Sequence, residues 1–194
     1  MLNTEIIGEL HSVRFRSKGF KRKRMLKPDQ ERTFLNFLIR ALGENVFLVS
    51  TGLGLDIYYL SSTNHTLFVA KNLWLFRPES RSEDGLFVHE EHTGKEVLGY
   101  FNTAVESLSV HPQLFLSCCK KLISQFNAMG IETPLNQLLY TCFDEQLNRL
   151  IKEERLPFVS KIEELRHQAE KPFLKSSDGI KRLAKQYMAD NHIN

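Results

Sequence analysis

The spacing of hydrophobic residues changes once along this 194-residue chain, near residue 109, and that change limits the possible folds more than any other feature. Before it, short runs rich in Val, Ile, Tyr, Phe and Leu are separated by turn-forming sequences such as TGLG and SSTNH, which is typical of antiparallel hairpins. After it, apolar residues recur every three or four positions, as in amphipathic helices. The pattern predicts an α+β fold, a small antiparallel sheet followed by a helical C-terminal half.

The first part of the chain is expected to hold four or five strands in meander order. They are predicted at residues 45–50, 55–61, 66–76, 86–90 and 96–101. A helix over residues 28–42 should cover one face of this sheet, because Pro28 suits the first helical position and Gly43 suits a helix end. Residues 4–16 follow neither period, so the sequence leaves open whether they form a strand or a loose arm.

The second part is expected to form four helices. Pro112 opens the first, which Gly130 closes, and Thr133 with Pro134 opens the second. A capping box formed by Ser160 and Glu163 predicts the start of the third. The last should run over about residues 178–189, with Ile180, Leu183 and Ala184 facing inward. The predicted organisation is a basic arm over residues 1–27 and one domain over residues 28–194, with the sheet at about 45–101 and the helices at about 109–190.

Positive charge is concentrated near the start of the chain. Eight of the 26 Lys and Arg residues lie in residues 14–27, whereas residues 28–194 carry 18 basic and 21 acidic side chains. Such a segment predicts an anionic partner, with nucleic-acid phosphates ahead of an acidic protein surface and a lipid headgroup surface. The residues expected to contact phosphates, without reading bases, are Arg14, Arg16, Lys18, Lys21, Arg22, Lys23, Arg24 and Lys27.

These features predict a non-enzymatic protein that binds nucleic acid or accompanies it. The alternative is an adaptor, chaperone or effector that docks a protein partner through its amphipathic C-terminal helices. Three cysteines with no paired spacing indicate a reducing compartment, and no run of apolar residues is long enough to span a membrane. The chain is therefore expected to be soluble and cytoplasmic, or nuclear in a eukaryote through the run KRKR.

A metal-dependent nuclease is a third interpretation. The segment KRKRMLKPDQERTFLNFLIRALGENVFLV resembles the basic lead, helix and first strand of nuclease domains of the restriction-enzyme type. That resemblance implies an Asp on one strand and an acid-x-Lys on the next. Asp56 and Lys71 match it, but Val69 stands where the acid belongs, so the resemblance implies either a degenerate, binding-only relative or an active enzyme.

The other motifs that could suggest a metal, nucleotide or nucleophile site have simpler structural interpretations. His89 and His92 lie three apart in a predicted strand, so they should point to opposite faces and hold no metal. The sequence GLGLD at residues 52–56 lacks the third glycine of a dinucleotide fingerprint and predicts a hairpin turn. Cys118, Cys119 and Cys142 lie on apolar helical stripes and are expected to pack as small hydrophobic residues. No catalytic residue and no cofactor is predicted.

Overall fold

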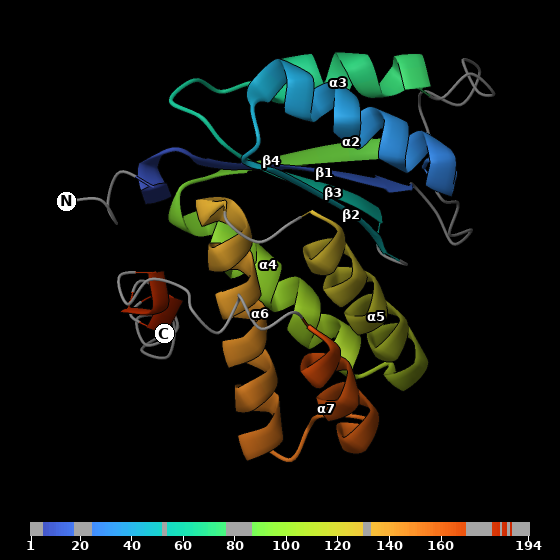
Figure 1. Cartoon of the computed structure of the whole chain (residues 1–194), viewed down its shortest axis with the longest axis vertical. Helices are drawn as coiled ribbons and strands as arrows, with labels where there is room; N and C mark the ends of the chain where they lie inside the picture. The colour runs from blue at the N-terminus through green and yellow to red at the C-terminus, as the bar shows by residue number, and fades with distance from the viewer. Residues whose placement is uncertain are drawn as a thin grey trace.

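The chain folds around a four-stranded antiparallel sheet with helices on both faces, as the α+β prediction requires (Figure 1). The computed structural model describes residues 6–17, 25–51, 54–76, 87–129, 133–169 and 180–187, the last range without residues 183 and 186. The strands are β1 (Leu10–Ser17), β2 (Val46–Thr51), β3 (Gly54–Leu60) and β4 (Phe87–Thr93). The helices are α2 (Pro28–Leu42), α3 (Thr66–Leu73) with the short 3-10 helix η1 (Trp74–Phe76), α4 (Lys95–Ser109), α5 (Pro112–Ala128), α6 (Pro134–Lys152) and α7 (Val159–Gln168).

The strands are interleaved rather than arranged as a meander. Their order across the sheet is β2-β3-β1-β4, so β1 and β3 are inner strands, and α2 and α3 each connect two strands that are not neighbours. This βαββαβ connectivity is that of the split βαβ, or ferredoxin-like, motif. The predicted meander was wrong because β1 inserts between β3 and β4.

Two of the predicted strands are helices. Residues 66–76 form α3 and η1, and residues 96–101 fall inside α4. Both segments are short apolar runs, for which hydrophobicity alone does not separate a strand from a buried helix. In α3 the buried residues Val69 and Leu73 are four apart, which gives the helix one face against the sheet.

Four of the other predicted helices are confirmed as α2, α5, α6 and α7, with one difference in how a helix starts. Helix α2 begins at Pro28 and the Gln30 side chain accepts a hydrogen bond of 2.8 Å from the Lys27 backbone N–H. Helix α7 begins at Val159 without the expected capping box at Ser160, since Phe158 precedes it with φ 54° in the left-handed region. In the described part of the terminal segment, Ile180 and Ala184 are buried as predicted, whereas Leu183 lies outside the described residues.

The sheet separates two hydrophobic cores. On one face, α2 and α3 pack Phe34, Leu38 and Val69 onto the sheet (Figure 1). On the other face, α4, α5, α6 and α7 form a larger core that includes Phe101 and Phe126. Both faces of the sheet are therefore covered, as the burial of consecutive residues in β1, β2 and β3 requires.

Strand β1 explains why residues 4–16 follow neither the helical nor the strand period. Every residue from Leu10 to Phe15 is buried, including His11, Ser12 and Arg14. Val13 and Phe15 face α2 and α3, whereas Leu10 joins the core on the other face. Residues 10–17, assigned to the basic arm from the sequence, are an inner strand of the sheet.

The close approach of β1 and β3 depends on Gly54. Its φ of +146° is rarely adopted by other residues, and a Cβ added there would lie 2.2 Å from the Phe15 carbonyl oxygen. Gly54 is the first residue of β3 and pairs with Thr51 across the predicted hairpin. A glycine in GLGLD is therefore needed for strand packing.

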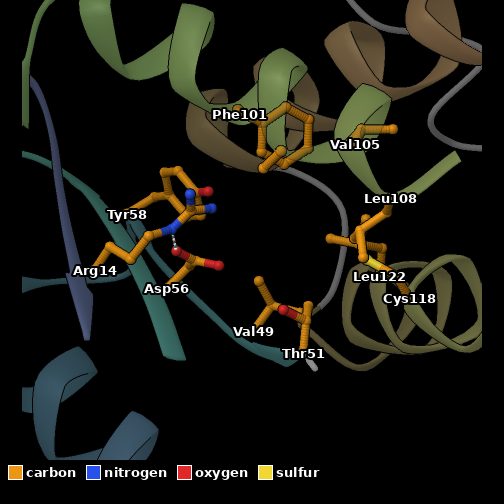
Figure 2. A pocket seen from close by; sticks show the side chains of 11 residues that line it. Arg14, Val49, Thr51, Asp56, Tyr58, Phe101, Val105, Leu108, Cys118 and Leu122 are labelled. Atoms are coloured by element: carbon orange, nitrogen blue, oxygen red, sulfur yellow. Dashed lines mark hydrogen bonds and ion pairs between the residues drawn. The ribbon is translucent and has the colours of Figure 1, made fainter. Parts of the chain in front are cut away.

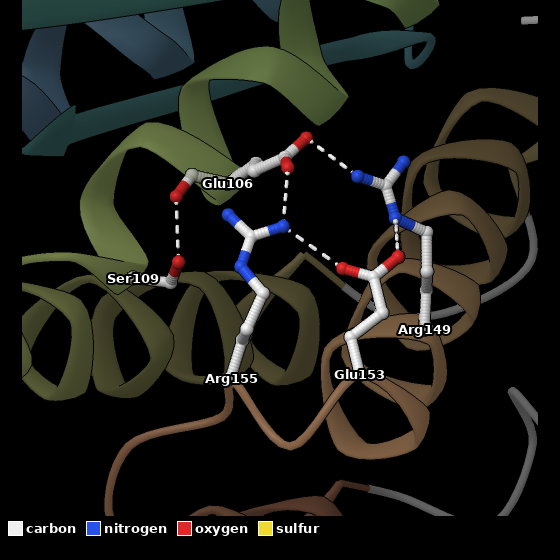
Figure 3. Close-up of polar contacts among 5 residues, drawn as sticks. All are labelled: Glu106, Ser109, Arg149, Glu153 and Arg155. Carbon is white, nitrogen blue, oxygen red and sulfur yellow. Dashed lines mark hydrogen bonds and ion pairs between the residues drawn. The ribbon is translucent and has the colours of Figure 1, made fainter. Parts of the chain in front are cut away.

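A network of charged residues fastens α4 to the end of α6 (Figure 3). Glu106 of α4 accepts from Arg149 at 2.7 Å and from Arg155 at 2.8 Å, and Glu153 bonds to both arginines. Burial raises the pKa of Glu106, but its bonds to the two arginines outweigh this and leave the pKa below its ordinary value. The carboxylate therefore stays charged and bridges the two helices at neutral pH.

Candidate functional site

A hollow lies between the sheet and helices α4 and α5 (Figure 2). Its volume of about 280 Å³ includes space open to solvent, and only about 20 Å³ of it has room for the centre of a water-sized molecule. The sheet contributes residues of β1, β2 and β3, and the helices contribute mostly apolar side chains. The lining residues include Arg14, Asp56, Phe101, Val105, Leu108 and Leu122.

A buried ion pair forms one wall of this hollow. Arg14 and Asp56 are directly opposite each other on β1 and β3, and the Arg14 Nε donates to the Asp56 Oδ1. Their side chains are only 4% and 6% exposed. Burial lowers the pKa of Arg14, but the negative charge of Asp56 outweighs it and raises the pKa above its ordinary value. The pair is thus fully charged and internally neutral.

An aromatic cluster adjoins the ion pair at the β4 side of the sheet. The Tyr100 ring of α4 lies 5.0 Å from the Arg14 guanidinium and 5.9 Å from that of Arg16, and it stacks on His92 at 3.7 Å. The Tyr100 hydroxyl donates to Glu90 at 2.5 Å. That bond and burial raise the pKa of Tyr100. The Arg14 guanidinium is therefore held between a carboxylate and an aromatic face.

The predicted phosphate-contacting residues have different positions. Arg14, at 3% exposure and paired with Asp56, does not offer a cation to an outside partner, so its predicted role is corrected. Arg16 is 37% exposed in its side chain and lies 3.7 Å from Glu90. Lys27 is exposed at the start of α2. Lys18, Lys21, Arg22, Lys23 and Arg24 lie outside the described residues.

Buried residues hold both ends of the remaining basic segment. Phe15 on β1 is 1% exposed, and Met25 and Leu26 before α2 are 4% and 1% exposed. All three belong to the core beneath α2 and α3. The cations at positions 18–24 therefore belong to a connection between two elements of the folded domain, and not to a terminal arm.

The residues of the nuclease interpretation do not converge. Asp56 lies on the face covered by α4 and α5, whereas Lys71 is an exposed residue of α3, which covers the opposite face. Val69 is fully buried in the core beneath α3. The only charged partner of Asp56 in the described part of the chain is Arg14, so the arrangement lacks the second carboxylate and lysine of that chemistry.

The two histidines of HEEH point to opposite faces of β4, as predicted. His89 contacts the Phe15 ring at 6.2 Å on the α2 face, and His92 stacks on Tyr100 beneath α4. Among the described residues, no group of three or more His, Cys, Asp or Glu side chains is placed to hold a metal ion.

The three cysteines are buried and unpaired by disulfides, as expected for small hydrophobic residues. Burial raises the pKa of Cys118 and of Cys142 to about 12 in each case, and the charge of Asp56 adds to the rise at Cys118. Burial also raises the pKa of Cys119. All three are therefore neutral thiols at physiological pH, a state in which cysteine is a poor nucleophile.

The pairing of Arg14 with Asp56 was not predicted from the sequence. Two signals were available: an Arg between Val13 and Phe15, and an Asp between Leu55 and Ile57, each with an apolar residue directly on both sides. A charge at such a position in a strand calls for an opposite charge on a neighbouring strand. Counting the arginine as part of a cationic arm obscured this partner.

Comparison of the chain with protein-family models, with curated proteins and with solved structures gives no match. In the part of the chain that the structure describes, no helix is both long enough and apolar enough to cross a membrane.

Proposed function

We propose that this protein is a non-enzymatic nucleic-acid-binding protein that neutralises phosphates with the cations of residues 18–27. The observation that supports the proposal is the charge of this segment together with its attachment to the fold. Residues 18–27 contain six Lys and Arg residues and no acid. The buried residues Phe15, Met25 and Leu26 attach the segment to the core at its two ends. A connection tied at both ends loses less conformational entropy on binding than a free tail does. The residues proposed to contact phosphates are Lys18, Lys21, Arg22, Lys23, Arg24 and Lys27, and Arg16 is close to them in the sequence.

The mode of binding follows from whether the aromatic side chains of the sheet are accessible to bases. Many four-stranded RNA-binding sheets stack bases on exposed aromatic residues of their open face. Here Tyr58 packs edge-on against Phe101 at 5.7 Å, and Phe47 stacks on Phe126 at 4.7 Å, so helices occupy those aromatic rings. The proposed contact is therefore with the phosphate backbone, which favours affinity over sequence preference.

Salt dependence tests the proposal. We expect a labelled single-stranded or duplex DNA to bind with an affinity that falls steeply as salt rises, measured by fluorescence anisotropy. Changing Lys21, Arg22, Lys23 and Arg24 together to Ala should weaken binding by at least about tenfold. On duplex DNA it should also reduce the slope of log K against log salt by about 3.6, since each of the four phosphate contacts contributes roughly 0.9.

A matched variant controls for net charge. Arg32, Arg40, Lys71 and Lys120 are exposed residues outside the segment. Changing these four to Ala lowers the net charge by the same amount as the first variant does. Most of the affinity for DNA, and most of its dependence on salt, should remain. Equal losses in the two variants would contradict a localised phosphate contact.

The adaptor alternative predicts a different outcome in the same assay. The apolar faces of α5 and α6 pack inward, so they are occupied, whereas α3 and η1 expose Leu67 at 67% and Leu75 at 75%. Exposed apolar side chains of this size favour a protein partner. If polyglutamate binds as tightly as DNA at equal charge, the acidic protein surface becomes the better proposal.

A further inference from the structure

The two edge strands of the sheet, β2 and β4, differ in how accessible their backbones are. Strand β2 lies between α2 and α5 (Figure 1), and every residue from Val46 to Ser50 is at most 5% exposed. The backbone carbonyl of Ser50 accepts a hydrogen bond from the Lys121 side chain of α5. The outer edge of β2 is therefore covered, and no further strand can join the sheet there.

Strand β4 instead presents an open row of backbone groups. The Gly94 N–H donates to the Leu10 carbonyl at 2.7 Å, and residues bonded to the neighbouring strand alternate with residues whose N–H and C=O point away from it. The register of β4 on β1 therefore turns the backbones of His89, Glu91 and Thr93 outward. All three residues are exposed, and no strand in the described part of the chain pairs with their outer side. Such an edge is a template for another strand.

The side chains along this edge complement themselves. His89 and Glu91 lie on the same face of β4, where the His89 Nε2 is 3.8 Å from the Glu91 Oε1, and they are 47% and 44% exposed. An imidazole N–H donates hydrogen bonds and a carboxylate accepts them. If two copies of β4 pair antiparallel about Glu90, each His89 lies directly opposite Glu91 of the second copy. Complementary side chains in directly opposite positions stabilise a strand pair.

Glu90 lies at the centre of this pairing, on the face covered by α4. There it already has a donor and a countercharge, since the Tyr100 hydroxyl donates to it at 2.5 Å and the Arg16 guanidinium is 3.7 Å away. These contacts offset the repulsion between the two copies of Glu90. Both glutamates of the edge thus have partners within the chain, so they attract an unrelated basic strand less than their charge suggests. The charges favour a second copy of the chain as the occupant.

We propose that two copies of this chain pair through β4, antiparallel and centred on Glu90, so that their two four-stranded sheets become continuous. Because the β2 edge is covered, the assembly stops at a twofold dimer and does not extend into a fibre. An interface made mainly by one pair of strands is small, so the dimer is weak. The interface excludes residues 18–27 and does not depend on nucleic-acid binding.

The first test uses the unmodified full chain. Sedimentation equilibrium over roughly 10 μM to 1 mM, the range of weak complexes, should show a monomer and a dimer and no larger species. Hydrogen exchange followed by NMR locates the contact. The amides of His89 and Glu91 should exchange more slowly as the protein concentration rises, whereas those of Glu90 and His92, which face β1, should be protected at every concentration.

Charge reversal tests the register of the pairing. His89→Glu places two carboxylates opposite each other, and Glu91→Lys places two cationic groups opposite each other, each twice in a symmetric dimer. Either substitution should weaken the dimer by about tenfold. The double variant exchanges the two charges, so it should dimerise at least as tightly as the unmodified chain. Glu163→Lys, at an exposed position of α7 and with the same change of charge as Glu91→Lys, should leave the dimer unchanged.

Three results would overturn the proposal. The first is a chain that stays monomeric over the whole concentration range, and the second is exchange at His89 and Glu91 that does not depend on concentration. The third is a folded double variant that dimerises as weakly as the single variants. If the chain alone is monomeric and an extended lysine-rich peptide protects these amides, the edge binds a basic strand and the proposed dimer is wrong. The measurements on the unmodified chain decide the matter even if a variant does not fold.

Discussion

The two faces of the sheet are built from different chemistry. Beneath α2 and α3 the core is apolar and aromatic, with Phe34 5.0 Å from Phe76 and 6.3 Å from Phe37. Beneath α4 the same sheet buries a charged pair, Arg14 and Asp56, next to an aromatic cluster. An apolar core needs only shape and area to be stable, whereas a buried charge needs one particular partner. On the second face, therefore, a single substitution in the ion pair should distinguish the effect of lost packing on stability from the effect of an unpaired buried charge.

The largest expected effect is at the ion pair. Arg14→Ala leaves Asp56 buried without its countercharge, and we expect the free energy of unfolding to fall by about 3–5 kcal/mol in urea denaturation. The double variant Arg14→Met with Asp56→Leu should lose much less than Arg14→Ala, because apolar residues replace both charges.

The apolar face gives the control for this comparison. Leu38→Ala should cost about 2–5 kcal/mol through a cavity, and no second substitution that removes a charge should restore it. If the double variant at positions 14 and 56 is as unstable as Arg14→Ala, the pair contributes through packing and the contrast between the faces fails.

A smaller effect, of opposite sign, is expected at Gln146 of α6. Gln146 is fully buried, and neither its Oε1 nor its Nε2 has a hydrogen-bond partner among the residues that the structure describes. Gln146→Met should raise the free energy of unfolding by about 1–2 kcal/mol, since it removes unpaired polar atoms from the core at nearly constant shape. Asn148 is the control, because its side chain bonds to Asp144 at 3.3 Å and to Arg166 at 3.0 Å.

Asn148→Leu should therefore lower stability where Gln146→Met raises it. A loss of stability in Gln146→Met would mean that the amide makes favourable contacts, and that every buried polar group on this face is compensated.

The smallest expected effect is on the pH dependence of stability. Burial lowers the pKa of His11, and burial also lowers the pKa of His92, from the ordinary value of 6.5. Between the lowered values and 6.5 the unfolded chain binds more protons than the folded chain, so stability should fall as the pH drops through this window. The two residues lie on opposite faces: His11 stacks on Tyr59 beneath α2 and α3, and His92 stacks on Tyr100 beneath α4.

His11→Phe should remove more of this slope than His92→Phe, because His11 is buried at 7% exposure whereas His92 is half-buried. The slope is read from urea denaturation at a series of pH values. An unchanged slope in both variants would assign the pH dependence to other groups.

The long helices and the class of the fold could be predicted from the sequence, because Pro28, Pro112 and Pro134 mark helix starts and the apolar period persists over many residues. The strand order could not, since nothing local in residues 10–17 says that this strand lies between β3 and β4. The error at α3 came from an apolar run too short to show a period. The ion pair was missed because its residues lie 42 positions apart, and only the register of β1 on β3 brings them together.

The separation of Arg14 from Asp56 has a consequence during synthesis. At about 5–20 residues per second, a ribosome needs roughly two to eight seconds to lengthen the chain by the 42 positions from Arg14 to Asp56. Strand β4, the other neighbour of β1, follows later still. Over that interval the first strand has neither of its pairing partners and its arginine stays hydrated, so the central part of the sheet assembles only after most of the N-terminal half has been translated.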